Sequence, residues 1–251
     1  TGSVVLQPLT DGTSVGIAGG AGGLQITSTH ISALADGFSS ITIGRATGTA
    51  AVTVGSSVSF SDPVLIQSNG ATGTVVVNGP VAGTGNATIT LTASGITLGY
   101  DAASGDVITT ANQGITLTGP VTLTADASIT TGTGAGTITV SGTVTNASGR
   151  TLELTAGTGS IDLQSAIGGG TALSSLTVYS ATTARFGGFF TTSAAPTEIY
   201  ATSLHNALPI STNTDVTFTG NVALQNNTVI TTGTGAGTIT VSGTVTNASG
   251  R

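Results

Sequence analysis

The sequence predicts an all-β fold in which short strands stack into a β-solenoid with coils of roughly 20 residues. Three observations predict this fold: the composition, a two-residue alternation of apolar and polar side chains, and internal repeats at long offsets. Of 251 residues, 6% are charged and 4% are aromatic, whereas 39 are Gly and 52 are Thr. Because a typical soluble domain has roughly a quarter charged residues, the composition points to a specialised, repetitive architecture.

The composition also excludes several other classes of protein. Disordered chains combine low hydrophobicity with high net charge, but here 38% of the residues are hydrophobic and the net charge is only −6. Collagen requires Gly at every third position, a period that the sequence lacks. No stretch reaches the roughly 18 consecutive apolar residues of a membrane helix, so we expect no membrane insertion.

Strict alternation of apolar and polar residues marks the expected strands. Apolar side chains point one way in short runs such as ITL at 89–91, ITL at 115–117 and ITV at 138–140, with Thr pointing the other way. This period of two is typical of a half-buried strand. Clusters such as GTGAG and NASG separate the runs and supply turn residues. The least strand-like stretch is STHISALADG at 28–37, where we expect one irregular turn.

Internal repeats define the organisation as one continuous solenoid segment over residues 1–251. Residues 130–150 and 231–251 are identical, and the wider stretches 111–150 and 212–251 match at an offset of 101. A weaker similarity at an offset of 63 aligns 72–93 with 135–156. We interpret 63 as three coils and 101 as five coils of about 20 residues.

Tandem β-sandwich domains are the alternative fold. A solenoid explains the scarcity of charge, because equivalent residues in successive coils lie about 4.8 Å apart. Two like charges at that distance repel by ~0.9 kcal/mol even in bulk water. A sandwich predicts a buried Trp and linkers at ~100-residue intervals, and the sequence has neither. These observations favour the solenoid.

Several sequence segments resemble those of large bacterial surface proteins of the filamentous-haemagglutinin and autotransporter type. They are GSVVLQPLTDGTSVGIAGGAGGLQIT (2–27), GFSSITIGRATGTAAVTVGSSVSFSDPV (37–64), ITLTGPVTLTADASITTGTGAGTITVSGTV (115–144) and SAIGGGTALSSLTVYSATTARFGG (165–188). The resemblance is one of repeat style, not of a catalytic motif. It implies a right-handed parallel β-helix, export to the extracellular bacterial cell surface, and a role in adhesion, biofilm or matrix contact, or rod-like spacing.

The residue inventory gives no support for an enzyme or a cofactor protein. Without Cys there is no thiol nucleophile and no thiolate metal site. The four Arg residues are dispersed and the isoelectric point is near 4.3, so we expect no nucleic-acid partner. No GxSxG, HExxH or phosphate-binding loop occurs. We therefore predict no catalytic residues, no metal and no cofactor.

Three weaker candidates for chemistry have structural alternatives. His30 and His205 lie far apart, which favours ordinary surface histidines over metal ligands. Asp101 and Asp106 suggest a Ca²⁺ loop, but their spacing fits a plain turn better. Glu153 and Asp162 could act as a glycosidase pair in a β-helix polysaccharide-degrading enzyme. Their separation along a coil normally places two side chains on different sides, so we expect them to be apart.

The sequence offers one candidate interaction patch, the aromatic cluster ARFGGFF. It comprises Arg185, Phe186, Phe189 and Phe190, and an irregular stretch follows it to residue 211. The alternatives are an aromatic stack in the core and an exposed contact for a host or matrix glycan or protein. A specific carbohydrate- or receptor-binding adhesin domain would use this region.

The segment SLHNALPIS at 203–211 interrupts the Thr- and Gly-rich composition of the chain. One interpretation is a loop or a bulky coil corner, which Pro209 suits. The other is a sequence-assembly artefact, because the segment resembles the translation of a sequencing-adapter read.

The sequences at both ends of the chain resemble those of strands. A solenoid cut between coils exposes unpaired strand edges, which invite pairing. We therefore expect continuation in a longer chain or end-to-end self-association, with unpaired edges at both ends.

Overall fold

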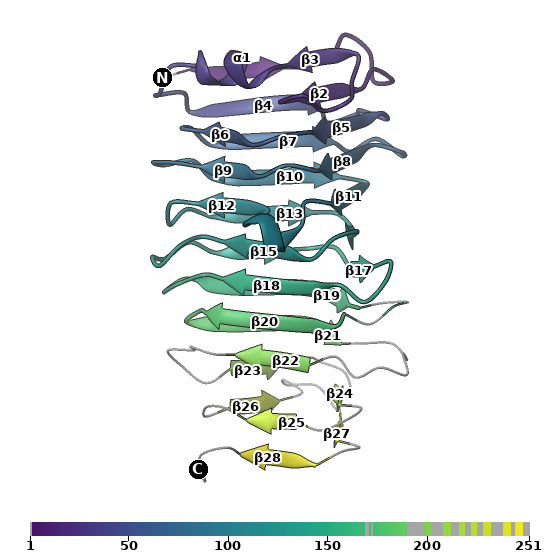
Figure 1. Ribbon diagram of the computed structural model, residues 1–251, viewed down its shortest axis with the longest axis vertical. Coiled ribbons are helices and arrows are strands. Elements are labelled where there is room, and N and C mark those ends of the chain that lie inside the picture. The colour runs from purple at the N-terminus through teal and green to yellow at the C-terminus, as the bar shows by residue number, and fades with distance from the viewer. Residues whose placement is uncertain are drawn as a thin grey trace.

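The protein is a β-solenoid, in which parallel strands stack along one axis (Figure 1). The computed structural model describes residues 2–168, 171 and 173–189. It also describes short segments at 198–201, 208–211, 216–218, 222–224, 228–231, 238–241 and 244–247. The predicted fold class is confirmed.

The strands form three stacks, and most turns contribute one strand to each. The first stack contains β1 (Ser3–Leu6), β4 (Ser40–Arg45), β7 (Val64–Ser68), β10 (Ile89–Ala93), β13 (Ile115–Thr118), β16 (Ile138–Val140), β19 (Ser160–Ile167) and β21 (Thr183–Phe189). The second contains β2 (Val15–Ile17), β3 (Leu24–Ile26), β5 (Ala51–Val54), β8 (Thr74–Val77), β11 (Gly95–Leu98), β14 (Val121–Leu123) and β17 (Val144–Asn146). The third contains β6 (Val58–Phe60), β9 (Val81–Gly83), β12 (Ile108–Thr110), β15 (Ala127–Thr130), β18 (Thr151–Thr155), β20 (Ser175–Ser180) and β22 (Glu198–Ala201).

The coils are longer than the sequence suggested. Inward positions of the first stack pair in the order Ile41, Val64, Ile89, Ile115, Ile138, Ile161 and Ala184. The spacing in sequence between such partners differs from one coil to the next and exceeds the predicted coil length at every step. The predicted coil length is therefore wrong, and coils of the observed length do not support the interpretation of the offset of 101 as five coils. The offset of 63 is not a whole number of coils, since it relates Leu91 of the first stack to Leu154 of the third.

Parallel pairing rules out the alternative of tandem β-sandwiches. Every strand pairing in the described part of the chain is parallel, from β1 with β4 to β25 (Val222–Leu224) with β28 (Val245–Asn247). Sandwich domains are built from antiparallel strands. Parallel strands require a crossover, and here the rest of each coil supplies it.

The core is a set of ladders in which each apolar side chain packs on its counterpart one coil away. The inward positions from Ile41 to Ile161 in the first stack are at most 2% exposed. β-branched side chains dominate these ladders, since they fit a pleated surface well. The ladders run the length of the rod, so each coil depends on its neighbours for burial.

Pro and Gly shape the corners between strands. Pro63, Pro80 and Pro120 directly precede β7, β9 and β14, and their carbonyl oxygens accept hydrogen bonds from the N–H groups of Ile41, Val58 and Ile96 in the preceding coil. Pro lacks a donor, so it is tolerated where a strand begins. The coil therefore turns at Pro without losing the hydrogen bond to the neighbouring coil.

The first coil is longer than the others, because Val4 pairs with Ile41. Its extra length contains β3, which pairs with β2, and helix α1 (Ser28–Ser32), which packs against β6 (Figure 1). Ile31 of α1 is 4% exposed. The stretch at 28–37 thus contains a helix where we expected an irregular turn. At this end, β3 and α1 cover two of the three stacks, so the expectation of unpaired edges on all of them is wrong here.

The matching stretches at an offset of 101 have the same strands. β24 (Val216–Phe218) pairs with β27 (Ile239–Val241) as β13 pairs with β16. β25 pairs with β28 as β14 pairs with β17. β26 (Thr228–Thr231) lies at the position of β15, but its partner is β23 (Leu208–Ser211). Part of the irregular segment 203–211 is therefore a strand, and residues 203–207 lie outside the described residues.

Substitution of Gly142 tests the close approach of successive coils at one corner. A Cβ on Gly142 would lie 2.0 Å from the carbonyl oxygen of Gly119 in the coil before it. We expect Gly142→Ala to lower the free energy of unfolding by ~1–3 kcal/mol through overpacking, as measured by urea denaturation. Gly95→Ala is the matched control, because its Cβ would meet its nearest neighbour, Thr74, at 3.6 Å. Equal stability of the two variants would contradict the close approach.

Candidate interaction surface

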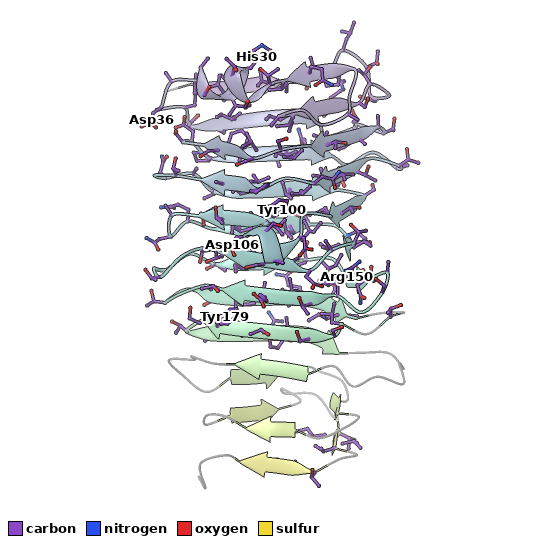
Figure 2. All side chains as sticks on the ribbon, viewed as in Figure 1. His30, Asp36, Tyr100, Asp106, Arg150 and Tyr179 are labelled. Carbon is purple, nitrogen blue, oxygen red and sulfur yellow. The ribbon has the colours of Figure 1, made fainter. Side chains whose placement is uncertain are left out.

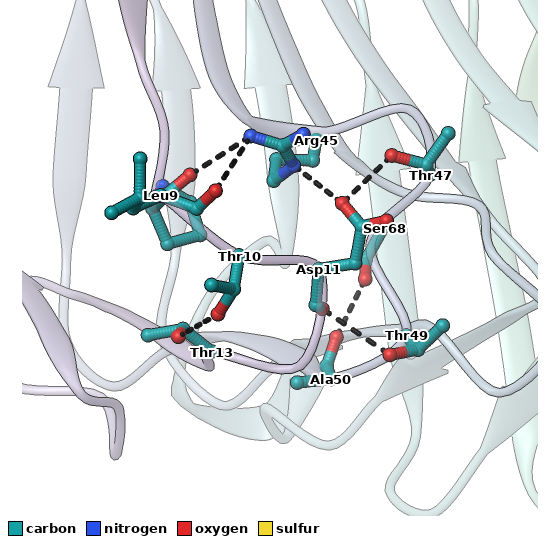
Figure 3. Close-up of polar contacts among 10 residues, drawn as sticks. Leu9, Thr10, Asp11, Thr13, Arg45, Thr47, Thr49, Ala50 and Ser68 are labelled. Atoms are coloured by element: carbon teal, nitrogen blue, oxygen red, sulfur yellow. Dashed lines mark hydrogen bonds and ion pairs between the residues drawn. The ribbon is translucent and has the colours of Figure 1, made fainter.

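An ion pair fixes the loop that follows β1 (Figure 3). Arg45 is the last residue of β4, and its Nε donates to Oδ1 of Asp11 over 2.5 Å. Its Nη1 donates to the carbonyl oxygens of Pro8 and Leu9, at 3.1 and 3.4 Å. Thr47 donates to the same Asp11 oxygen over 2.8 Å. A charge-assisted network thus holds the loop against the second coil.

This network holds Leu9 in solvent, where it is 93% exposed. The Thr47 hydroxyl and the Arg45 guanidinium lower the pKa of Asp11 below its ordinary value, because both stabilise the carboxylate. Arg45 and Thr47 both form hydrogen bonds to the loop itself. The backbone oxygen of Asp11 in turn accepts a hydrogen bond from the N–H of Thr49 over 2.8 Å. The network is therefore a structural clamp.

The structure gives His30 and the two Asp residues of the proposed Ca²⁺ loop structural partners. His30 lies in α1, where its Nδ1 accepts from the N–H of Thr27 while its own N–H donates to the Thr27 hydroxyl. Asp101 accepts from the N–H of Ala103 and caps the 3₁₀-helix η1 (Ala102–Ser104). Asp106 accepts from the hydroxyl of Ser128. Such reciprocal capping as that of Thr27 and His30 stabilises a helix end.

The titratable side chains labelled in Figure 2 are spread along the rod, and they do not converge on one place. Among the described residues, no three His, Asp or Glu side chains gather at a distance that could hold a metal ion. His205 lies outside the described residues.

Glu153 and Asp162 lie on different stacks, as we predicted. Glu153 is on β18 of the third stack and Asp162 is on β19 of the first. The Glu153 carboxylate raises the pKa of Tyr179, since a phenolate beside it would be repelled. The two carboxylates therefore do not form a glycosidase pair.

The aromatic cluster is divided between the core and the surface. Phe186 is fully buried and extends the inward ladder beside Leu163, so it cannot belong to an exposed patch. Arg185 points outward with its side chain 64% exposed, 3.6 Å from the Asp162 carboxylate in the preceding coil. The side chain of Phe189 and all of Phe190 lie outside the described residues. Of the four predicted patch residues, the structure thus places Arg185 alone on the surface.

Sequence reasoning placed Thr on the outward side of the strands, but it did not predict which Thr residues align on the outer face of the first stack. Thr90, Thr116 and Thr139 occupy successive outward positions, and Thr92 pairs with Thr118 in the same register. All five are half-buried or exposed. Their hydroxyl groups form no hydrogen bond within the described part of the protein. The alternating TxT pattern was visible in the sequence, but the shorter coil that we predicted would not have aligned it.

In the described strands, a charged side chain does not lie next to a side chain of the same charge in the neighbouring coil. Asp162 lies between Thr139 and Arg185. Glu153 lies between Ser128 and Thr177. No carboxylate is stacked on a carboxylate in these registers, which agrees with the electrostatic argument for scarce charge.

No family model matches the chain, and no curated protein or solved structure is significantly similar to it. Within the described residues, no helix has both the length and the apolar character needed to cross a lipid bilayer.

Loss of the Arg45 clamp should loosen the loop it holds. We expect Arg45→Met to speed hydrogen exchange of the Thr49 amide several-fold, because that amide donates to the clamped Asp11 backbone. Arg185→Met, which removes an ion pair at a distant coil, is the control and should leave this exchange unchanged.

Acid should have the same effect as Arg45→Met. A lowered pKa means that the clamp stabilises the fold fully above the ordinary Asp value of 3.8, and that this contribution is lost as pH falls below it. Asp11→Asn should abolish the acid dependence of Thr49 exchange. A wild-type exchange profile that matches that of Asp11→Asn would contradict the role of Asp11.

Proposed function

We propose that the protein is a rod-like structural segment of an extracellular bacterial surface fibre or adhesin. One observation carries this proposal: the first stack pairs in parallel without interruption from β1 to β21. Every coil is hydrogen-bonded to the next along this stack, and such an architecture acts as a stiff spacer with a repeated lateral surface. The resemblance of its sequence segments to those of filamentous-haemagglutinin-like and autotransporter proteins supports the extracellular location in this proposal.

The chemistry of the surface supports a structural role over catalysis. The described Asp side chains at positions 11, 62, 101, 106 and 126 accept hydrogen bonds from neighbouring loops and strands. These carboxylates stabilise turns and coil-to-coil contacts. A rod that depends on such contacts needs no reactive group.

The form of the assembly follows from the first coil. Since β3 and α1 lie over the second and third stacks, this end does not present open strand edges on those stacks for head-to-tail stacking. Continuation of the same solenoid in a longer chain, with lateral contact to a matrix glycan or protein, fits the fold better.

A second candidate is a specific receptor- or carbohydrate-binding adhesin domain centred on Arg185. It is favoured by one observation, the ion pair of Arg185 with Asp162, which ends the neutral outer row of the first stack. A charged pair on a neutral surface can orient a polar ligand.

Surface labelling of the source cells tests the main proposal. We expect an antibody raised against the purified chain to label intact cells on projecting fibres, because the proposal places the rod outside the cell. An antibody to a cytoplasmic protein is the control and should label permeabilised cells alone. Labelling by the first antibody that also requires permeabilisation would contradict the proposal.

A further inference from the structure

The outer face of the first stack carries a two-dimensional array of hydroxyl groups, which we call the Thr array. It consists of Thr90 and Thr92 on β10, Thr116 and Thr118 on β13, and Thr139 on β16. The pairings of Thr90 with Thr116, Thr116 with Thr139 and Thr92 with Thr118 contain no register shift. The array is therefore regular in both directions.

The hydroxyl groups of the Thr array are available to an external partner. Some other Thr hydroxyls bond within the protein: Thr124 donates to the carbonyl oxygen of Leu98, and Thr145 to that of Val121, each over 3.3 Å. None of the hydroxyls in the array has a protein partner in the described part of the chain. Each can donate one hydrogen bond and accept two.

The Thr array contains no charged residue, and side chains other than Thr flank it in the coils on both sides. Leu65 and Gln67 flank it in the coil before β10. Asp162 flanks it in the coil after β16. Small-molecule sites combine apolar and aromatic side chains with a few polar or charged groups in a concave pocket, and the array contains neither an aromatic ring nor a charge. A neutral partner whose own hydrogen-bonding groups repeat in two dimensions fits it better.

The spacing of the array is close to that of a tetrahedral water lattice. Neighbouring strands lie about 4.8 Å apart, and alternate residues along a strand lie about 6.7 Å apart. Oxygen atoms joined by a hydrogen bond lie about 2.8 Å apart, so second neighbours in a tetrahedral network lie about 4.6 Å apart and its layers repeat about every 7.4 Å.

The spacings agree more closely across the strands than along them, and the array is longest across the strands. Across the strands the spacings differ by about a twentieth, so the mismatch stays small over three coils. Along the strand they differ by about a tenth, but the array spans a single interval there. The accumulated mismatch therefore stays below about 1 Å in both directions.

We propose that the Thr array binds ice, with its hydroxyl groups replacing water at lattice positions. This inference goes beyond the proposed function and does not depend on where the protein is located. The backbone pairing of Thr217 with Thr240 repeats that of Thr116 with Thr139.

The test is the growth of ice crystals in the presence of the full chain, observed by microscopy together with inhibition of ice recrystallisation. We expect the wild-type protein to shape the crystals and to slow their coarsening. Thr116→Lys should lose both effects, because a strongly hydrated ammonium at the centre of the array holds its own water shell. Crystals that grow with wild-type protein as they do in buffer would overturn the proposal.

Thr109→Lys is the matched control for the added charge. Thr109 is half-buried on β12 of the third stack, where it pairs outward with Ala82 and Thr130. This variant should retain the wild-type effect on ice, and the thermal unfolding of both Lys variants should show that they are folded. An equal loss in Thr109→Lys would overturn the assignment to the Thr array. So would retention of the wild-type effect in a folded Thr116→Lys protein.

Discussion

The in-register hydrogen bonding of each coil to the next is the constraint on which the rest of the structure depends. It brings every residue of a strand to about 4.8 Å from its counterpart in the neighbouring coil. A residue at a given position must therefore be compatible with a similar residue on both sides. Apolar inward positions satisfy this by forming ladders such as Ile89, Ile115 and Ile138. Outward positions satisfy it with Thr, which is neutral and β-branched, and with charges that are isolated or paired with an opposite charge.

The same constraint connects the fold to the proposed roles. A stack in which each coil buries its neighbour extends by adding coils, so its length can vary while its cross-section does not. Its lateral faces repeat, and a repeated face suits a partner that also repeats. The first coil is the exception, because α1 and β3 interrupt the repeat and cover two stacks. The buried carboxylate of Asp62 supports this coil by accepting from the N–H of Gly37 at 3.0 Å.

The sequence was sufficient to predict the fold class and the strand positions, because alternation and repetition are local signals. It was not sufficient for the coil length, because the step from Ile41 to Val64 is shorter than the step from Ile89 to Ile115 and no single period fits both. Helix α1 was missed because a single short turn is too brief to display a helical period. At the candidate site, separation of Glu153 from Asp162 was predictable. The burial of Phe186 and the alignment of the Thr array were not, since both depend on the register between coils.

Residues one coil apart in sequence, such as Thr116 and Thr139, lie side by side in space. The chain has no Cys, so a pair of introduced cysteines reports a single distance. We expect Thr116→Cys/Thr139→Cys to form an intramolecular disulfide on mild oxidation, because paired strands bring the two Cα atoms within disulfide range. Thr116→Cys/Glu153→Cys, with its partners on different stacks, should remain reduced. A disulfide in the second protein, or none in the first, would contradict the stacking of the coils.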